Sequence, residues 1–146
     1  MIQMKNVYKK YPNGVVATNG ISVDIKQGEF VYVVGPSGAG KSTFIKLMYR
    51  EEKATSGGVI VNGINLTTIR NNAVPKFRRQ LGVVFQDFKL LPRLTVYENV
   101  AFALEVIEES PKIIRKRVMD VLELVGLSHK ARMFPNELSG GEQQRV

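Results

Sequence analysis

The segment Gly35-Pro36-Ser37-Gly38-Ala39-Gly40-Lys41-Ser42 fits the pattern G-x-x-x-x-G-K-[ST], which joins a strand to a helix. An apolar run over residues 30–34 precedes the segment and an apolar helical stretch over residues 43–48 follows it, so the context agrees with the pattern. Glycines let the backbone turn so tightly that successive N–H groups point into one concavity, and a helix N-terminus adds partial positive charge. The segment therefore predicts a phosphate loop that binds a nucleoside triphosphate.

Two side chains of this loop have predicted roles. Lys41 is expected to reach the terminal phosphates, and the Ser42 hydroxyl is expected to take a ligand position on Mg²⁺. The predicted nucleotide-binding residues are Gly35, Pro36, Ser37, Gly38, Ala39, Gly40, Lys41, Ser42 and Thr43. The structural alternative is a glycine-rich turn with an incidental lysine. The loop alone does not separate kinases, GTPases, helicases and transport ATPases.

Patterns on either side of the loop predict an α/β fold. Strands are expected at residues 2–8, 21–25, 30–34, 59–61 and 81–85. The uninterrupted apolar run over residues 30–34 predicts a strand that is buried on both faces. After Phe85 the pattern becomes helical. Strands followed by helices suggest a mixed-sheet core over residues 1–86 and a helical subdomain over residues 87–146.

Capping residues mark the predicted helices. Thr95 and Glu98 form a capping box before one helix, and Ser110 with Pro111 begins another that ends near Gly126. The apolar stripe of that second helix consists of Ile114, Val118, Val121, Leu122 and Val125.

A second candidate anion site follows near residue 139. Ser139 and Glu142 have the spacing of a capping box, so a helix is expected to begin there. Gly140 and Gly141 leave the amides of the first turn uncovered, and these amides with the Ser139 hydroxyl are able to bind an anion. A capped helix with no further role is the alternative.

Composition excludes several classes of protein and site. Hydrophobic residues make up 44% and charged residues 23% of the 146 residues, as in ordinary globular domains. With no cysteine and one histidine, His129, thiolate or multi-histidine metal sites are excluded, and His129 is expected in a surface loop. No apolar run has the length of a membrane span or a secretory signal, so a cytoplasmic protein is expected. The net charge of +8 is spread out and not interleaved with aromatics, so no nucleic-acid partner is expected.

The stretch Leu138-Ser139-Gly140-Gly141-Glu142-Gln143-Gln144 resembles the signature motif of ATP-binding cassette (ABC) ATPases, and the phosphate loop precedes it at a suitable distance. Gln86 is similar to the Q-loop glutamine of that family, and Tyr11 to its adenine-stacking aromatic. The sequence at residues 74–79, 85–91, 95–101 and 135–145 resembles that of the cell-division members most. The lipoprotein-release and macrolide-export members share much of it.

This resemblance implies a P-loop NTPase of the ABC type that binds ATP with Mg²⁺. Gln86 and Lys41 would be the catalytic residues, and Ser42 and Gln86 the metal ligands. Two copies would enclose two ATP molecules, each bound by Tyr11 and the phosphate loop of one copy. The other copy would bind the same ATP in trans through Ser139, Gly140, Gly141 and Glu142.

The resemblance also implies a partner and a location. A membrane subunit would dock near the groove after Gln86, so that contact with the membrane is indirect, on the cytoplasmic face at the division site. The apolar residues available for that contact, or alternatively for the subdomain core, are Phe88, Leu90, Leu91 and Leu94.

The family continues into a strand ending in Asp-Glu and a switch histidine, and neither follows the signature within these 146 residues. By resemblance, the chain is expected to be the N-terminal portion of a longer ATPase, ending before the Walker B strand and inactive alone. Three hypotheses remain open: a cell-division ATPase, an exporter ATPase of the lipoprotein-release or macrolide type, and a non-hydrolysing nucleotide-binding module.

Overall fold

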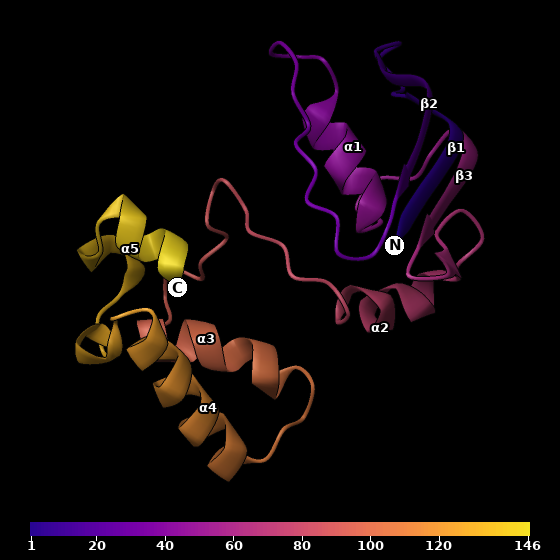
Figure 1. Cartoon of the computed structure of the whole chain (residues 1–146). Coiled ribbons are helices and arrows are strands. Elements are labelled where there is room, and N and C mark those ends of the chain that lie inside the picture. Colours follow the sequence, from indigo (N-terminus) through magenta and orange to yellow (C-terminus); the bar gives the residue numbers. More distant parts are fainter. The chain divides into compact units, whose positions relative to one another are not determined.

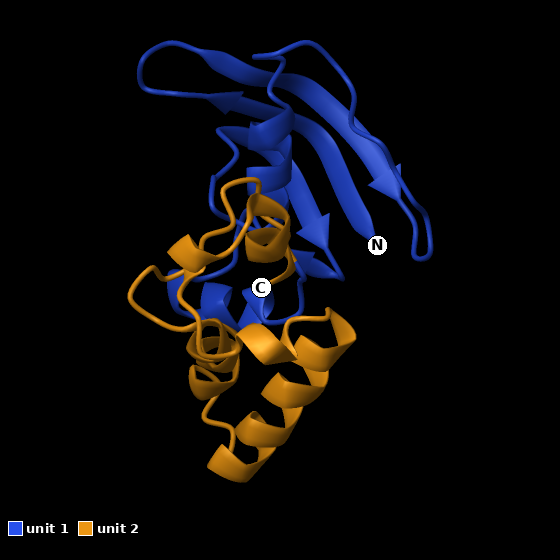
Figure 2. Cartoon of the chain, turned by 90° about the vertical axis from the view of Figure 1, so that its left-hand side faces the viewer, with its two compact units in different colours: residues 1–82 blue, residues 83–146 orange.

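The structure is a computed structural model that describes all 146 residues (Figure 1). It divides into two compact units, unit 1 over Met1–Gly82 and unit 2 over Val83–Val146 (Figure 2). The division predicted from the sequence, after residue 86, lies slightly further along the chain. Each unit has its own hydrophobic core, so each is described by itself.

Unit 1 is built on a four-stranded sheet with the order β2-β1-β3-β4. Its strands are β1 (Ile2–Lys10), β2 (Val16–Ile25), β3 (Ser56–Val61) and β4 (Ile64–Asn65), and every pair is antiparallel. β1 and β2 form a hairpin in which Ile2 lies opposite Ile25. The strands predicted at residues 2–8, 21–25 and 59–61 all lie within this sheet.

Helix α1 (Lys41–Met48) packs on the sheet of unit 1. Its buried face carries Phe44 and Leu47, which belong to one cluster with residues of β1 and β3. That cluster consists of Met4, Val7, Phe44, Leu47, Val59, Val61, Leu66 and Phe77. Phe77 comes from α2 (Val74–Arg78), which follows a 3-10 turn at Asn71–Ala73. The core therefore fixes the helix that follows the phosphate loop.

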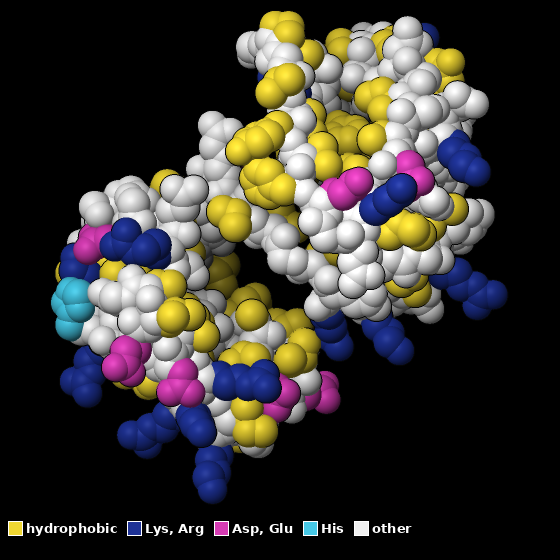
Figure 3. Space-filling model, viewed as in Figure 1, with side chains coloured by type: hydrophobic (Ala, Val, Ile, Leu, Met, Phe, Trp, Pro, Cys, Tyr) yellow, Lys and Arg dark blue, Asp and Glu magenta, His cyan; other side chains and the backbone are white.

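Two predicted strands are absent from the structure. Residues 30–34 and 81–85 have no regular secondary structure and are not part of the sheet. The first run was expected to be buried on both faces, yet Phe30 is 80% and Val34 86% exposed. Figure 3 shows hydrophobic side chains gathered on one face of unit 1 over this part. An apolar run has a preference for burial, but burial also needs segments that cover it on both faces. Val31 and Val33 are still 47% and 41% exposed, so this run is covered only in part.

Unit 2 is helical, with α3 (Val96–Glu105), α4 (Pro111–Leu124) and α5 (Gly140–Arg145). Two 3-10 turns, Ser128–Lys130 and Pro135–Glu137, join α4 to α5. The core of the unit consists of Val96, Ala101, Ile114, Val118, Leu122, Leu127 and Leu138. Exposed His129 lies in the first of these turns. The helices begin where the capping residues predict.

Details of α4 differ from the prediction. Val121 was expected in the buried stripe but is 44% exposed, because it lies at the edge of the face that Ile114, Val118 and Leu122 bury. Ser110 is the N-cap residue, yet its side chain makes no capping hydrogen bond. Gly126 has a φ of +73°, as a left-handed C-terminal cap requires.

Candidate functional site

The phosphate loop of unit 1 follows a backbone path that only glycine permits at its last turn. Gly40 is the N-cap residue of α1 and has a φ of +89°. A Cβ atom there would overlap the carbonyl oxygen of Ala17 in β2, so the loop lies directly against the sheet. The first helical hydrogen bond runs from the amide of Phe44 to the carbonyl of Gly40, at 2.8 Å. The amide of Ala39 donates to the carbonyl of Pro36 at 3.2 Å, whereas the amides of the first turn of α1 have no partner within the helix.

Lys41 folds back over this loop. Its Nζ donates to the carbonyl oxygens of Gly35 at 2.8 Å and Pro36 at 2.7 Å. An ammonium group has three donors, so one remains after these two bonds. The positive charge is therefore held over the loop, and its contact with a terminal phosphate stays a prediction.

Tyr11 lies next to the start of α1. Its hydroxyl is 3.1 Å from the Oγ1 atom of buried Thr43, and the Nζ of Lys9 is 4.8 Å from the centre of its ring. The turn that follows is closed by the amide of Tyr11, which donates to the carbonyl of Val15 at 2.8 Å. The structure thus brings Tyr11, the phosphate loop and Thr43 together. Stacking of Tyr11 on adenine stays a prediction.

The residues of the loop fit a magnesium ion through Ser42. This side chain follows Lys41 directly, is exposed and has no hydrogen-bond partner, so its oxygen is available to a metal. No group of three or more Asp, Glu, His or Cys side chains gathers anywhere in the structure. Ser42 therefore offers an exposed hydroxyl oxygen that fits a Mg²⁺ ligand, and its role on the metal stays a prediction.

Gln86 lies in unit 2, at the start of the segment that leads to α3. It is exposed and precedes a tight turn in which Phe88 and Lys89 have φ angles of +55° and +56°. The Nζ of Lys89 pairs with the carboxylate of Asp87 at 2.6 Å. The predicted site residues thus fall into two groups, with Gln86 and the signature residues in unit 2 and the others in unit 1.

The start of α5 is organised around the carboxylate of Glu142. The amide and the hydroxyl of Ser139 both donate to it, at 2.9 Å and 2.8 Å, as the capping-box spacing predicts. Lys130 also pairs with it at 2.6 Å. Gly140 and Gly141 are exposed, and a Cβ atom on either would meet open space. Ser139, Gly140 and Gly141 thus present an uncovered surface, while Glu142 is used within the unit.

These contacts hold the pKa of Glu142 far below its usual value of 4.5, at about 2. The hydrogen bond from Lys130 is the main cause, followed by the bonds from the amide and hydroxyl of Ser139. The ionised carboxylate therefore stabilises the start of α5 above about pH 4.5, and this stabilisation is lost as the pH falls through about 2.

Replacing Lys130 by alanine should raise the pKa of Glu142, because the main cause of its depression is removed. The bonds from Ser139 remain, so the pKa should stay below 4.5. The measurement is an NMR titration of the Glu142 carboxyl carbon, with Lys116→Ala, an exposed lysine of α4, as the control. An unchanged Glu142 titration in the Lys130 variant would contradict the contact.

The sequence patterns did not identify two residues that contact these site residues, Lys130 and Lys9. Lys130 is twelve residues from Glu142, and no local spacing rule links residues that far apart. The contact of Lys9 with Tyr11 could have been predicted from their spacing. Residues two apart in an extended chain point to the same side, so the two side chains are neighbours.

Comparison with known proteins shows which family this chain matches. The family described as ABC transporter matches residues 18–146. The chain is 70% identical to the cell division ATP-binding protein FtsE of Bacillus subtilis and 60% identical to that of Streptococcus pneumoniae, each over 146 residues. It is 44% identical to the methionine import ATP-binding protein MetN of Helicobacter hepaticus, of which it covers 42%. The whole chain aligns in each case and spans 64% of the length of the two FtsE relatives.

Solved structures agree with this assignment. A dimeric structure of the ATP-binding cassette MJ0796, in a post-hydrolysis state bound to ADP and Pi, matches with a TM-score of 0.90 and 38% identity. The match covers 99% of this chain and 66% of that one. The predicted α/β fold with a helical subdomain is confirmed. None of the helices in the structure has the length and apolar character needed to cross a membrane.

Proposed function

Since the chain belongs to the ABC transporter family, we propose that it is the ATP-binding part of a cell-division ATPase that works with an FtsX-type membrane subunit. The observation that carries this proposal is the phosphate loop, where Lys41 is held over the free amides at the start of α1. Identity to the FtsE relatives, at 70% and 60%, exceeds the 44% to a methionine-import relative, and this difference favours cell division over transport.

Binding of ATP would proceed from contacts that the loop already has in place. The triphosphate would accept hydrogen bonds from the loop amides and from Lys41, whose bonds to Gly35 and Pro36 it would partly replace. Mg²⁺, held by Ser42 and by Gln86, would neutralise charge on the phosphates. The ring of Tyr11, anchored through Thr43, would lie against the adenine.

A dimer would complete the site. The MJ0796 structures are dimeric, and one of them holds ADP and Pi. We propose that two full-length copies meet head to tail, so that exposed Ser139, Gly140 and Gly141 of one copy contact the nucleotide on the phosphate loop of the other. Glu142 would act by holding the start of α5 in place, through its bonds to Ser139 and Lys130.

The proposed location is the cytoplasmic face of the membrane at the division septum, reached through the partner subunit. Of the apolar residues offered for that contact, Leu91 is 38% exposed, while Phe88, Leu90 and Leu94 are half-buried. Leu91 is thus the residue of this group best placed for the partner.

Co-purification tests the choice of partner. The full-length protein should co-purify with an FtsX-type subunit and not with a permease of a lipoprotein-release or macrolide exporter when each is co-expressed with it. Co-purification with an exporter permease alone would assign the protein to the exporter branch. Retention of ATP binding in that case would leave the nucleotide site intact and reject only the cell-division role.

A polypeptide of these 146 residues is proposed not to hydrolyse ATP, because none of the four acids of unit 1 lies in the loop at residues 35–43. Glu29 accepts from the backbone of Lys26, Glu51 pairs with Lys46, and Glu52 pairs with Lys9. The remaining acid of the unit, Asp24, is exposed on β2. Uncatalysed phosphoryl transfer to water is extremely slow.

Phosphate release from the purified 146-residue chain with Mg²⁺ should therefore equal that of its Lys41→Ala variant. Turnover that depends on Lys41 would contradict this proposal and would make Asp87, beside Gln86, the first carboxylate to examine.

A further inference from the structure

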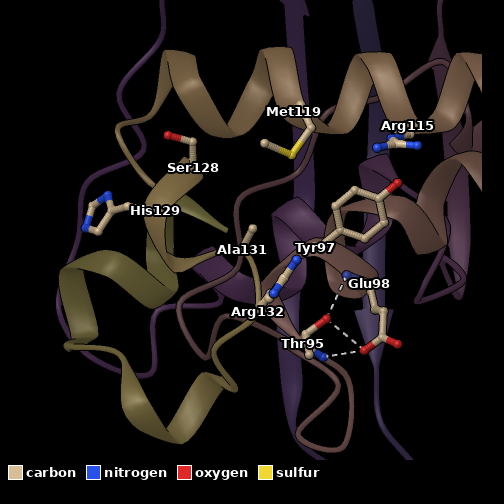
Figure 4. A pocket seen from close by; sticks show the side chains of 9 residues that line it. All are labelled: Thr95, Tyr97, Glu98, Arg115, Met119, Ser128, His129, Ala131 and Arg132. Atoms are coloured by element: carbon tan, nitrogen blue, oxygen red, sulfur yellow. Dashed lines mark hydrogen bonds between the residues drawn. The ribbon is translucent and has the colours of Figure 1, made fainter.

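A hollow of about 570 Å³ lies entirely within unit 2, and neither the signature residues nor Gln86 line it (Figure 4). One wall is α4, another is the start of α3, and the third is the chain around the turn Ser128–Lys130. None of the residues that line it has a role in the nucleotide site proposed above. The hollow is therefore unexplained by ATP binding.

Two arginines face this hollow without partners. Arg115 projects from α4 and Arg132 from the chain before α5, and neither forms a hydrogen bond or ion pair within the structure. The carboxylate nearby, Glu98, accepts from the amide and hydroxyl of Thr95 at 2.7 Å and 2.8 Å. Glu98 keeps its negative charge while it caps α3, but it pairs with neither arginine, so the hollow retains a net positive charge.

An apolar surface lies between these cations. Figure 4 shows the ring of Tyr97 and the side chain of Met119 close together in the middle of the hollow. Met119 is 39% exposed and Tyr97 is half-buried. A methionine adapts its shape to what it contacts, and a tyrosine ring offers a large apolar area.

The same surface continues along α4. A second hollow, of about 640 Å³, shares Arg115 and Met119 and adds Lys112 and Lys116, with Asp120 as its one acid. Figure 3 shows Lys and Arg side chains over this part of unit 2, with Asp and Glu side chains among them. From Lys112 to Met119 the helix rises about 10 Å, the length of about three residues of extended chain. We refer to the two hollows together as the α4 groove.

We propose that the α4 groove binds an extended acidic peptide segment of a partner protein. Carboxylates of the segment would pair with Arg115 and Arg132, where the planar guanidinium groups favour two-point contact. An apolar side chain between them would lie on Tyr97 and Met119. The first hollow has walls on three sides and contains Tyr97 and Met119, which fits a peptide better than the flat surface of an anionic membrane. This inference does not depend on the proposed ATPase role.

The test uses full-length protein at physiological salt and a fluorescein-labelled peptide of alternating glutamate and leucine, followed by fluorescence anisotropy. The double variant Arg115→Gln with Arg132→Gln should bind the peptide at least about tenfold more weakly, because two charge-assisted contacts are lost. The matched control, Arg117→Gln with Lys76→Gln, removes the same charge at exposed positions outside the groove and should change affinity less than about twofold. Tyr97→Ala should weaken binding without changing charge.

Three results would overturn the proposal. The first is absence of peptide binding by the unmodified protein. The second is equal weakening by the groove variant and its control, which would indicate general attraction to a basic protein. The third is arginine-dependent binding to phosphatidylglycerol vesicles in place of the peptide, which would make the surface a lipid contact. Circular dichroism of each variant checks that these exposed substitutions leave the helices intact.

Discussion

Lys41→Ala should weaken ATP binding by the full-length protein about 100-fold or more. The Nζ of Lys41 already lies over the loop through its bonds to Gly35 and Pro36, and its charge has no carboxylate partner. Hydrogen bonds between charged groups contribute about 1.5–3 kcal/mol each, so losing one or two of them removes most of the affinity. Titration with a fluorescent ATP analogue measures the effect.

The matched control for this prediction lies on the same helix. Lys46, near the other end of α1, pairs with Glu51 at 2.9 Å, and its side chain forms no hydrogen bond or ion pair with the phosphate loop. Lys46→Ala should therefore bind the analogue as the unmodified protein does. Equal affinities of the Lys41 variant and the unmodified protein would mean that the loop is not the nucleotide site.

Ser139→Arg should abolish the ATP-dependent dimer while each monomer still binds ATP within about twofold of the unmodified affinity. Ser139 is exposed at the uncovered start of α5, in a different unit from the phosphate loop. A long cation at this position would obstruct approach to the nucleotide on the other copy. Light scattering of the full-length protein with ATP gives the oligomeric state.

Two further variants separate obstruction from loss of the helix cap. Ser139→Asn keeps a capping side chain of small size and should still dimerise. Ser110→Arg places the same cation at another exposed N-cap whose side chain makes no capping bond, and it should dimerise normally. Dimerisation of Ser139→Arg, or a loss of monomer binding as large as that of Lys41→Ala, would contradict the arrangement in trans.

The helices and their ends could be predicted from the sequence because their determinants are local. The capping boxes at Thr95 and Ser139 join residues three apart, and both form as expected. The phosphate loop was also predictable, since glycine at position 40 is what its left-handed backbone and its approach to Ala17 require. The capping boxes and the positive φ of Gly40 depend on a few neighbouring residues, whereas the approach of Gly40 to Ala17 in β2 is a long-range contact.

Strand pairing was less predictable because it depends on segments far away in the chain. The apolar runs at residues 30–34 and 81–85 have the composition of buried strands, yet no other strand of the structure pairs with them. The ion pair between Lys130 and Glu142 is similar, since it depends on how the chain returns from α4 to α5. Composition gives a segment's preference for burial, whereas its neighbours decide whether that preference is met.

The most direct test of ATP binding at the phosphate loop is an amide NMR titration of the isotope-labelled full-length protein with ATP and Mg²⁺. The largest shift changes are expected at the amides of residues 35–43, with a smaller change at Tyr11, whose hydroxyl lies 3.1 Å from Thr43. Shift changes confined to other parts of the chain, with residues 35–43 unaffected at saturating ATP, would contradict the account.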